Sequence, residues 1–133
     1  MSAPAAREDD QVVAVDTHIV MVQAGPATVP TPLPHPFTGI LDGDLVSSVT
    51  IGGKAAAVAG STATNRPAHI ATPPGLSFQS PPADSGTIQA GSASVLIGGK
   101  QAARLGDTAM TCNDPTDMPV GTVIGSATVL IGG

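Results

Sequence analysis

A five-residue phrase that ends in Ile-Gly-Gly occurs three times in this chain. The copies are Val-Thr-Ile-Gly-Gly at residues 49–53 and Val-Leu-Ile-Gly-Gly at residues 95–99 and 129–133. A recurring phrase indicates a recurring structural unit, and it constrains the fold more than composition does. A β-branched stretch that runs into two glycines is typical of a short strand followed by a tight turn. We therefore expect three related units of strand and loop.

The sequence around the three copies indicates that the chain ends cut one of the units. Residues 54–61 and 100–107 follow the first two copies and resemble each other, whereas nothing follows the third copy. The missing half matches residues 4–10 at the N-terminus, which align with residues 101–107. We therefore expect a closed ring of three units in which the two chain ends are neighbours. The alternative is chance similarity among segments rich in Gly, Ala and Val.

Composition predicts a single all-β domain over residues 1–133. Glycine (16) and proline (13) are abundant, which favours turns over long helices. Aromatic residues make up only 2% of the chain, so the core is expected to be narrow and aliphatic. Residues 88–97 and 122–131 are each expected to form a strand. The prolines of residues 26–36 are expected to keep that segment out of a central sheet.

Charge and hydropathy exclude some classes of partner. A net charge of −5 leaves no basic patch for nucleic acid, so we expect no nucleic-acid partner. No apolar run is long enough to span a membrane, and no signal peptide is recognisable. The single cysteine, Cys112, cannot form an internal disulfide.

Each unit carries one residue able to bind a soft or borderline metal ion. His18, His69 and Cys112 follow corresponding positions of the three units, and the proline-rich segment adds His35. Three imidazoles and one thiolate form a closed tetrahedral set that suits zinc. The separations match no zinc-finger spacing. The residues alone therefore leave two interpretations: a metal site, or unrelated histidines and a buried, apolar cysteine.

Several of these segments together resemble the PAAR family, over nearly the whole chain. They are Pro-Ala-Ala-Arg at residues 4–7, Gln-Ala-Ala-Arg-Leu-Gly-Asp at residues 101–107, and the Gly-Ser-x-x-Val-x-Ile-Gly-Gly phrases. Members of this family form a small, sharp β-cone on the trimeric spike of contractile injection systems. These systems include type VI secretion systems, extracellular phage-tail-like particles and some phage tails. The resemblance implies a pseudo-three-fold β-helical cone of three strand-loop repeats, with one structural Zn²⁺ near its tip held by His18, His35, His69 and Cys112.

The resemblance also implies a partner and a mechanical role. One chain would cap a trimeric VgrG-like spike and sharpen it for membrane puncture. It would contact the target membrane transiently. Whether it also carries an effector as cargo is left open. The blunt end of such a trimer exposes strand edges, and three quasi-equivalent strands in one chain can each meet one edge. We expect assembly in the bacterial cytoplasm and delivery as part of the particle. The expected contact residues are Ile51, Gly52, Gly53, Ile97, Gly98, Gly99, Ile131, Gly132 and Gly133.

Two features depart from the shortest members of the family. Residues 55–58 read Ala-Ala-Ala-Val where the motif has Pro-Ala-Ala-Arg, so a role for that arginine cannot be three-fold. The long proline-rich segment favours an extracellular type of particle. The chain stops at Gly133, so we expect no effector extension. Arg7 and Arg104 are expected either to pair with nearby aspartates or to bind backbone carbonyls, with a solvated surface pair as the alternative.

Three other functions compete with a structural spike tip. A zinc hydrolase would keep one coordination position open for water, whereas four candidate ligands leave none. A thiol enzyme would need a free Cys112 thiolate, which tight metal binding would remove. A generic zinc-stabilised β-domain would have no affinity for a trimeric spike. We therefore expect no enzymatic activity.

Overall fold

The chain folds into strands and loops. The structure is a computed structural model that describes residues 2–133, and these contain no helix, so the all-β prediction is confirmed. None of the described residues belongs to a helix capable of crossing a membrane. The strands are β1 (Ser2–Pro4), β2 (Gln11–Ala24), β3 (Ala27–Gly43), β4 (Val46–Ile51), β5 (Lys54–Ala56), β6 (Thr62–Asn65), β7 (Gly75–Phe78), β8 (Ser85–Ile88), β9 (Leu96–Ile97), β10 (Lys100–Gln101), β11 (Thr108–Thr111), β12 (Met118–Ile124) and β13 (Leu130–Gly132).

Six antiparallel strands form a sheet that closes on itself. The order β12, β11, β8, β6, β3, β2 is completed by a further pairing between β12 and β2. β7 adds to β2 beyond the closed part of the sheet. Closure pairs most strand edges within the chain, which removes sites for unwanted strand addition.

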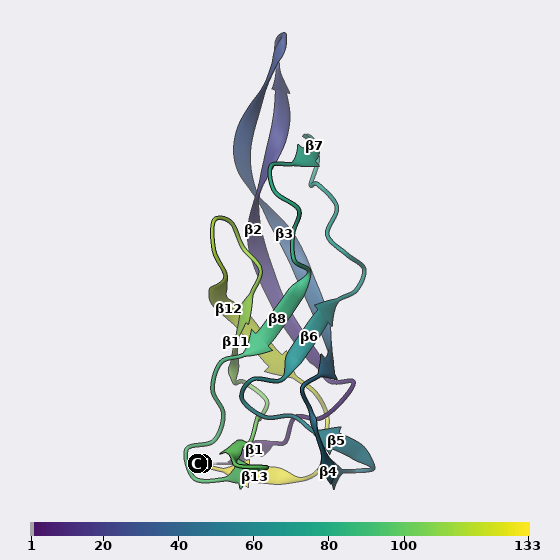
Figure 1. The fold of residues 1–133 in the computed structure, drawn as a ribbon, viewed down its shortest axis with the longest axis vertical. Helices are drawn as coiled ribbons and strands as arrows, with labels where there is room; N and C mark the ends of the chain where they lie inside the picture. Colours follow the sequence, from purple (N-terminus) through teal and green to yellow (C-terminus); the bar gives the residue numbers. More distant parts are fainter. Residues whose placement is uncertain (1) are drawn as a thin grey trace.

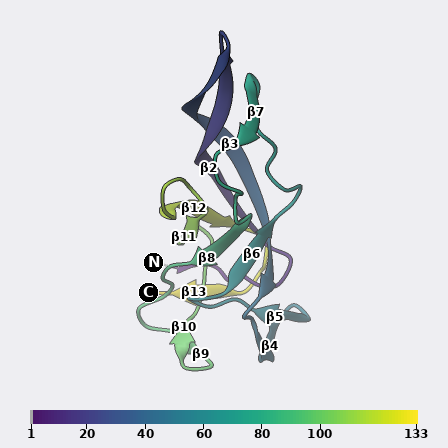
Figure 2. The ribbon, with the colours of Figure 1, turned by 45° about the horizontal axis from the view of Figure 1, so that its top comes forward.

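The β2–β3 hairpin is much longer than the rest of the sheet. Its pairing runs from Gln11 opposite Ile40 to Ala24 opposite Ala27, and a turn at Gly25 with φ +61° joins the strands. The hairpin rises beyond the other strands to form the narrow end of an elongated molecule, with β7 beside it (Figures 1 and 2). The two chain ends lie near the opposite end (Figure 1).

The prediction that the prolines keep residues 26–36 out of a sheet is wrong. Four of them alternate along β3 and pair in register with β2. Thr38 continues the same alternation, and its N–H points away from β2 to Asn65 Oδ1 at 2.9 Å. The alternate positions of β3 therefore direct their nitrogens to the free edge, where a missing N–H breaks no ladder hydrogen bond. These prolines are Pro30, Pro32, Pro34 and Pro36.

Three short two-stranded sheets lie at the opposite end of the molecule and are called the base here. They are β4–β5, β9–β10 and β1–β13. Gly52 and Gly53 turn the first with φ +58° and +82°, and Gly98 and Gly99 turn the second with φ +59° and +79°. Two successive residues with positive φ define the turn type that suits twisted hairpins. The third pairs the two chain ends, with Ser2 opposite Gly132, so the prediction of neighbouring termini is confirmed.

Two long strands predicted from the sequence are interrupted. Residues 88–97 divide into the end of β8 and the short β9, and residues 122–131 divide between β12 and β13. In the first case Ser92 redirects the chain, because its N–H donates to Ala102 O at 2.8 Å and its hydroxyl donates to Gly132 O at 2.6 Å. Gly91 packs so closely on the backbone of Ala102 that a Cβ would lie 2.3 Å from its carbonyl oxygen. The prediction of continuous strands is therefore wrong.

The three repeated segments contact one another in a closed cycle of backbone hydrogen bonds. Ala6 N donates to Ala103 O (2.9 Å), Ala103 N to Ala57 O (3.0 Å), and Ala57 N to Ala6 O (3.0 Å). All three alanines are fully buried. A second cycle joins Glu8 to Ala55, Ala59 to Gln101 and Leu105 to Pro4, at 2.8–2.9 Å. Because both cycles use only backbone atoms, the departure from the motif at residues 55–58 leaves them intact.

The two motif arginines differ in their contacts. Arg104 Nη2 lies 3.0 Å from Asp107 Oδ1, so this arginine pairs with its aspartate. Arg7 Nη1 instead donates to Ile51 O at 3.2 Å. Each of the two expected arrangements therefore occurs once. Gly52 makes room for Arg7, since a Cβ there would lie 2.3 Å from Nη1.

Candidate metal centre

Four segments bring the predicted ligands to one buried region. Asp16 and His18 are alternate residues of β2, so their side chains share the inward face of that strand. His35 lies opposite Asp16 on β3. His69 follows β6, and Cys112 follows the last residue of β11. The hairpin continues beyond His18 to its turn, so the region lies inside the molecule below the projecting end (Figure 1).

Three predicted ligands and one unpredicted residue form a compact group. Asp16, His18, His69 and Cys112 each offer a ligand atom, and these atoms lie within 4.8 Å of one another. Cys112 Sγ lies 3.6 Å from His18 Nε2 and 3.5 Å from Asp16 Oδ2. His69 Nε2 lies 2.9 Å from the same carboxylate oxygen. Two imidazoles, a thiol and a carboxylate are donors that zinc accepts.

Asp16 is fully buried and has no lysine or arginine partner among residues 2–133. Its ion pairs are with His18 and His69. Oδ1 accepts hydrogen bonds from the Thr111 hydroxyl at 2.5 Å and from Asn113 Nδ2 at 3.4 Å. A buried carboxylate is costly unless a positive charge and hydrogen bonds compensate it. A bound divalent cation would supply that charge.

His18 also has an unsatisfied ring nitrogen. Its Nδ1 is buried without a hydrogen-bond partner, and the nearest acid is Asp114, whose Oδ2 lies 3.5 Å away. Its Nε2 points to Cys112, so the ring presents one nitrogen to the group and the other to this acid. Metal-bound histidines commonly turn their second nitrogen toward a carboxylate, which fixes the tautomer. The orientation of His18 therefore fits a metal ligand.

His35 lies beside the group, but both of its ring nitrogens have partners. Nδ1 lies 2.9 Å from Leu33 O, and Thr72 N donates to Nε2 at 3.1 Å. The tautomer that satisfies both bonds carries its proton on Nδ1. Burial lowers the pKa of His35 below its ordinary value, which favours the neutral ring. To bind a metal through Nε2, His35 would have to give up its bond with Thr72.

Backbone contacts tie the loop after β11 to β2. Thr17 N donates to Asn113 Oδ1 at 2.6 Å, and Ile19 N donates to Asp114 Oδ2 at 2.8 Å. These bonds fix the position of Cys112, which precedes both loop residues. The loop of His69 is held in the same way, because His69 N donates to Asp84 Oδ1 at 2.8 Å. The candidate ligands are thus positioned by hydrogen bonds that involve no metal.

The environment of Cys112 keeps its thiol protonated in the metal-free state. Burial, followed by the negative charge of Asp16, raises the pKa of Cys112 to about 11. A reactive catalytic cysteine has the opposite shift, toward lower pKa. A metal ion would have to displace this proton in order to bind the thiolate.

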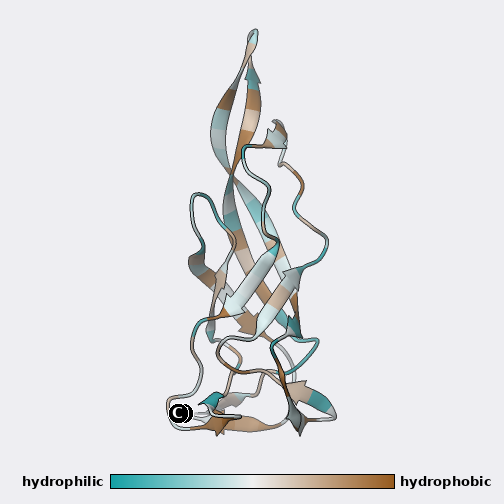
Figure 3. Ribbon diagram, in the orientation of Figure 1, coloured by the Kyte–Doolittle hydropathy of each residue, from teal (hydrophilic) through white to brown (hydrophobic). Residues whose placement is uncertain are grey.

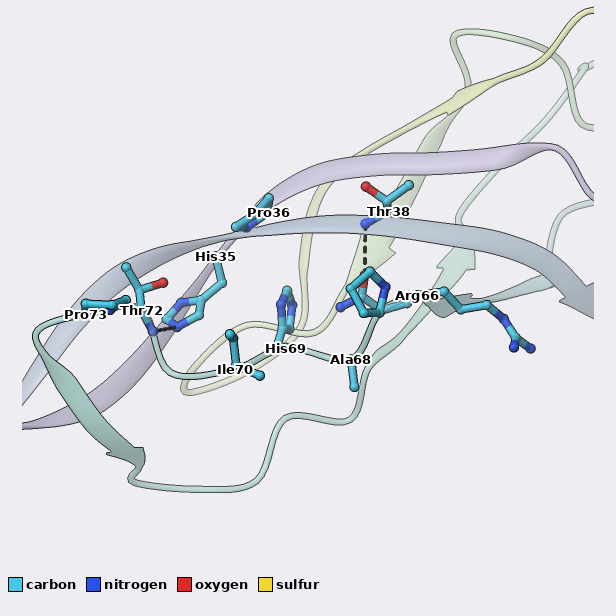
Figure 4. Close-up of a pocket in the computed structure, with 11 residues that line it drawn as sticks. His35, Pro36, Thr38, Arg66, Ala68, His69, Ile70, Thr72 and Pro73 are labelled. Carbon is cyan, nitrogen blue, oxygen red and sulfur yellow. Dashed lines mark hydrogen bonds between the residues drawn. The ribbon is translucent and has the colours of Figure 1, made fainter.

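A cavity of about 340 Å³ opens on one side of the group. Its lining includes His35, His69 and Ile70 together with prolines, and it includes no carboxylate. Figure 4 shows His35 hydrogen-bonded to Thr72 at one end of the cavity, with His69 between them and Arg66, whose side chain extends away. The cavity therefore reaches two of the histidines, and neither Asp16 nor Cys112 lines it.

The predicted contact residues lie in the hairpins of the base, and their side chains differ in exposure. Ile51 and Ile131 are buried, and Ile97 packs against the same small cluster. The preceding apolar residues point outward, with Leu96 63% and Leu130 61% exposed. The isoleucines therefore belong to the core of the base, and the apolar surface comes from their neighbours. The alternation of side chains along each short strand could have indicated this from the sequence.

Asp16 is the residue of the group that the sequence analysis missed. It stands two residues before His18 in a stretch of alternating apolar and polar residues. In a strand, residues two apart share a face, so the Asp-x-His spacing was the available signal. The ligands expected in each unit were soft or borderline ones, so a carboxylate was not among them.

Comparison with known families identifies the C-terminal part of the chain. Residues 79–133 match the family model of the PAAR motif. This confirms, for that part of the chain, the resemblance on which the sequence analysis relied. The motif is consistent with a PAAR-repeat protein of contractile injection systems. No curated protein and no solved structure matches the chain.

Proposed function

We propose that the chain is a structural spike-tip protein that caps the trimeric, VgrG-like spike of a contractile injection system. The observation that carries this proposal is the closed hydrogen-bond cycle through Ala6, Ala57 and Ala103. The cycle supports an arrangement in which one chain offers three similar sides around a common axis. A pseudo-three-fold cone of this kind resolves the mismatch between a single capping chain and a three-fold partner.

The base supplies a surface suited to that contact. Its outward apolar side chains come from all three repeats: Val49 and Val129 are exposed, as are Leu96 and Leu130. Exposed apolar groups that gather at one end of a small protein indicate an interaction surface. In this proposal the turns of the Ile-Gly-Gly phrases approach the spike, and these side chains fill its blunt end.

A structural zinc ion would stiffen the middle of the molecule. The core contains few large side chains, and a metal can replace packing in a domain of this kind. His18, His69 and Cys112 would hold the ion, with Asp16 or His35 completing the set. The ion would supply a rigid cross-link between three segments, or four if His35 completes the set, and a positive charge beside Asp16.

An enzymatic function finds less support in the site. The two histidines that line the cavity are engaged in hydrogen bonds, His35 through both ring nitrogens and His69 through Nε2 to Asp16, which opposes their use as a general base. The thiol of Cys112 is buried, and its raised pKa opposes nucleophilic catalysis. The long β2–β3 hairpin favours an extracellular type of particle. In this proposal the protein is assembled into the particle in the bacterial cytoplasm and is released as part of it.

The capping proposal is tested at the base by binding to a purified trimeric spike from the same system. Leu96→Asp and Leu130→Asp place a charge at the proposed contact, and each should weaken binding at least about tenfold, as expected for interface anchors. Leu76→Asp is the matched control, since Leu76 is similarly exposed at the other end. Unchanged binding by both base variants, or equal loss in the control, would contradict the proposal.

A further inference from the structure

The projecting end of the molecule carries no charged side chain. No Asp, Glu, Lys or Arg lies between Asp16 and Asp42, or between Arg66 and Asp84. These two stretches contain the upper hairpin and β7, which pairs with β2 through Val20, Met21 and Val22. We call residues 19–33 and 75–78 together the tip.

Charges are confined to the rest of the molecule. Lys54 pairs with Asp9, and Arg66 pairs with Asp42 below the hairpin. Lys100 begins β10 in the base. In Figure 3 hydrophobic residues reach almost to the turn of the hairpin. An exposed hairpin on a soluble protein is normally kept soluble by charges along it, and the upper part of this one, between Asp16 and Asp42, has none.

One face of the hairpin forms a continuous uncharged strip. Residues directly opposite in an antiparallel pair place their side chains on the same face. The prolines of β3 are exposed, and Val15 at the lower end of the strip is 64% exposed. The cross-strand pairs are Val15 with Pro36, Thr17 with Pro34, Ile19 with Pro32, and Met21 with Pro30.

The same prolines remove hydrogen-bond donors from the free edge of the hairpin. The alternate positions of β3 face that edge, and a proline there has no N–H. A strand with free N–H groups is costly to place in lipid, where each unsatisfied group costs several kcal/mol. One of the outward carbonyls, that of Pro34, accepts a hydrogen bond from the Thr72 hydroxyl at 2.9 Å.

We propose that the tip binds the apolar region of a lipid bilayer through the upper part of this strip, the pairs of Ile19 with Pro32 and Met21 with Pro30, and through the side chains around the hairpin turn. The inference rests on the proposed role as a spike tip, but it concerns the opposite end from the base. No basic side chain lies in the tip, so binding depends on apolar contact and does not require anionic lipid. Because prolines occupy the outward positions from Pro30 to Pro36, that edge of β3 has fewer N–H donors to bury, and with no charged side chain the tip enters lipid at lower cost.

The test uses a single tryptophan as a reporter, because the chain has none. Thr28→Trp places the indole beside the hairpin turn, and Val129→Trp places it on the base. With vesicles of pure phosphatidylcholine, the emission of the tip reporter should shift to the blue and be quenched by brominated lipid. The base reporter should show neither change. Adding phosphatidylglycerol or salt should leave the shift unaltered.

A charge in the tip provides the matched variant. Val29→Asp and Leu76→Asp lie at exposed positions, so the fold should persist, and together they should abolish the blue shift of the tip reporter. Leu130→Asp at the base should retain the shift while losing spike binding. No shift for the tip reporter, a shift only with anionic lipid, or an equal shift for the base reporter would overturn the inference. Spike binding is measured on the same proteins, so the capping proposal and the lipid inference can fail separately.

Discussion

At the residue scale, charge matters as much as geometry in the buried group of Asp16, His18, His69 and Cys112. Asp16 is a buried acid whose ion pairs among the described residues are with histidines, Cys112 is a thiol that resists ionisation, and His18 has a ring nitrogen without a hydrogen bond. Each of these features is unfavourable alone, and a divalent cation relieves the first two together. The metal-free fold is held by hydrogen bonds around the group, so the ion would enter a largely prepared site.

The geometry and the family resemblance predict different fourth ligands: the geometry favours Asp16, and the resemblance implies His35. Asp16→Asn should reduce bound zinc, measured by elemental analysis, from one per chain to a small fraction, because it removes the carboxylate nearest the other ligands. His35→Gln should retain most of the metal, because His35 is already hydrogen-bonded through both nitrogens. Cys112→Ser serves as a control that should lose metal in either case. The reverse ranking of Asp16→Asn and His35→Gln would place His35 in the coordination sphere.

Metal binding should depend on pH through Cys112. Because the folded thiol has a pKa of about 11, binding releases its proton, and zinc affinity should rise about tenfold per pH unit between pH 7 and 9. The folding stability of the metal-free protein should change with pH in the opposite direction. The raised pKa makes the folded state bind this proton more tightly than the unfolded state, so stability falls as pH rises from about 9 toward 11. Competition titrations with a chelator would measure the zinc affinity, and urea unfolding would measure the stability of the metal-free chain. A zinc affinity that does not change with pH would contradict the first prediction.

At the element scale, the β2–β3 hairpin shows what the sequence could and could not predict. The Gly-Gly turns of β4–β5 and β9–β10 were predictable because the phrase repeats and because paired positive φ values need glycine. The long β3 was missed, because proline is excluded only where its nitrogen faces a partner strand. The alternation of Pro30, Pro32, Pro34 and Pro36 was visible, but which edge they face depends on tertiary pairing. The interruption at Ser92 likewise depends on contacts with distant Gly132 and Ala102.

The prolines should protect the free edge of β3 from self-association. Pro30→Ala with Pro32→Ala restores two outward N–H groups and leaves the pairs with β2 intact. We expect an increased tendency to dimerise or aggregate at high concentration, measured by sedimentation velocity, since open strand edges promote pairing between chains. Pro81→Ala with Pro82→Ala in the loop before β8 is the matched control. Monomeric behaviour of the β3 variant at every concentration would show that the prolines have another role.

At the scale of the whole molecule, one chain has two different ends. The base gathers the three Ile-Gly-Gly phrases, both termini and the lysines, whereas the opposite end is the uncharged upper part of the β2–β3 hairpin with β7 beside it (Figure 2). The three repeated segments meet between them in the hydrogen-bond cycles of Ala6, Ala57 and Ala103. The proposed role calls for both features: three related hairpins at the base to meet a trimer, and one projecting hairpin to end in a point.

The most direct test of this account is the mass of the complex with a trimeric spike. Native mass spectrometry of the purified chain mixed in excess with the spike should give one chain per trimer, because the three sides of the base engage the three spike chains at once. The mass should stay the same as the excess is raised. A complex with three chains per trimer would show that each spike chain binds its own copy, and it would contradict the claim that one chain supplies all three sides.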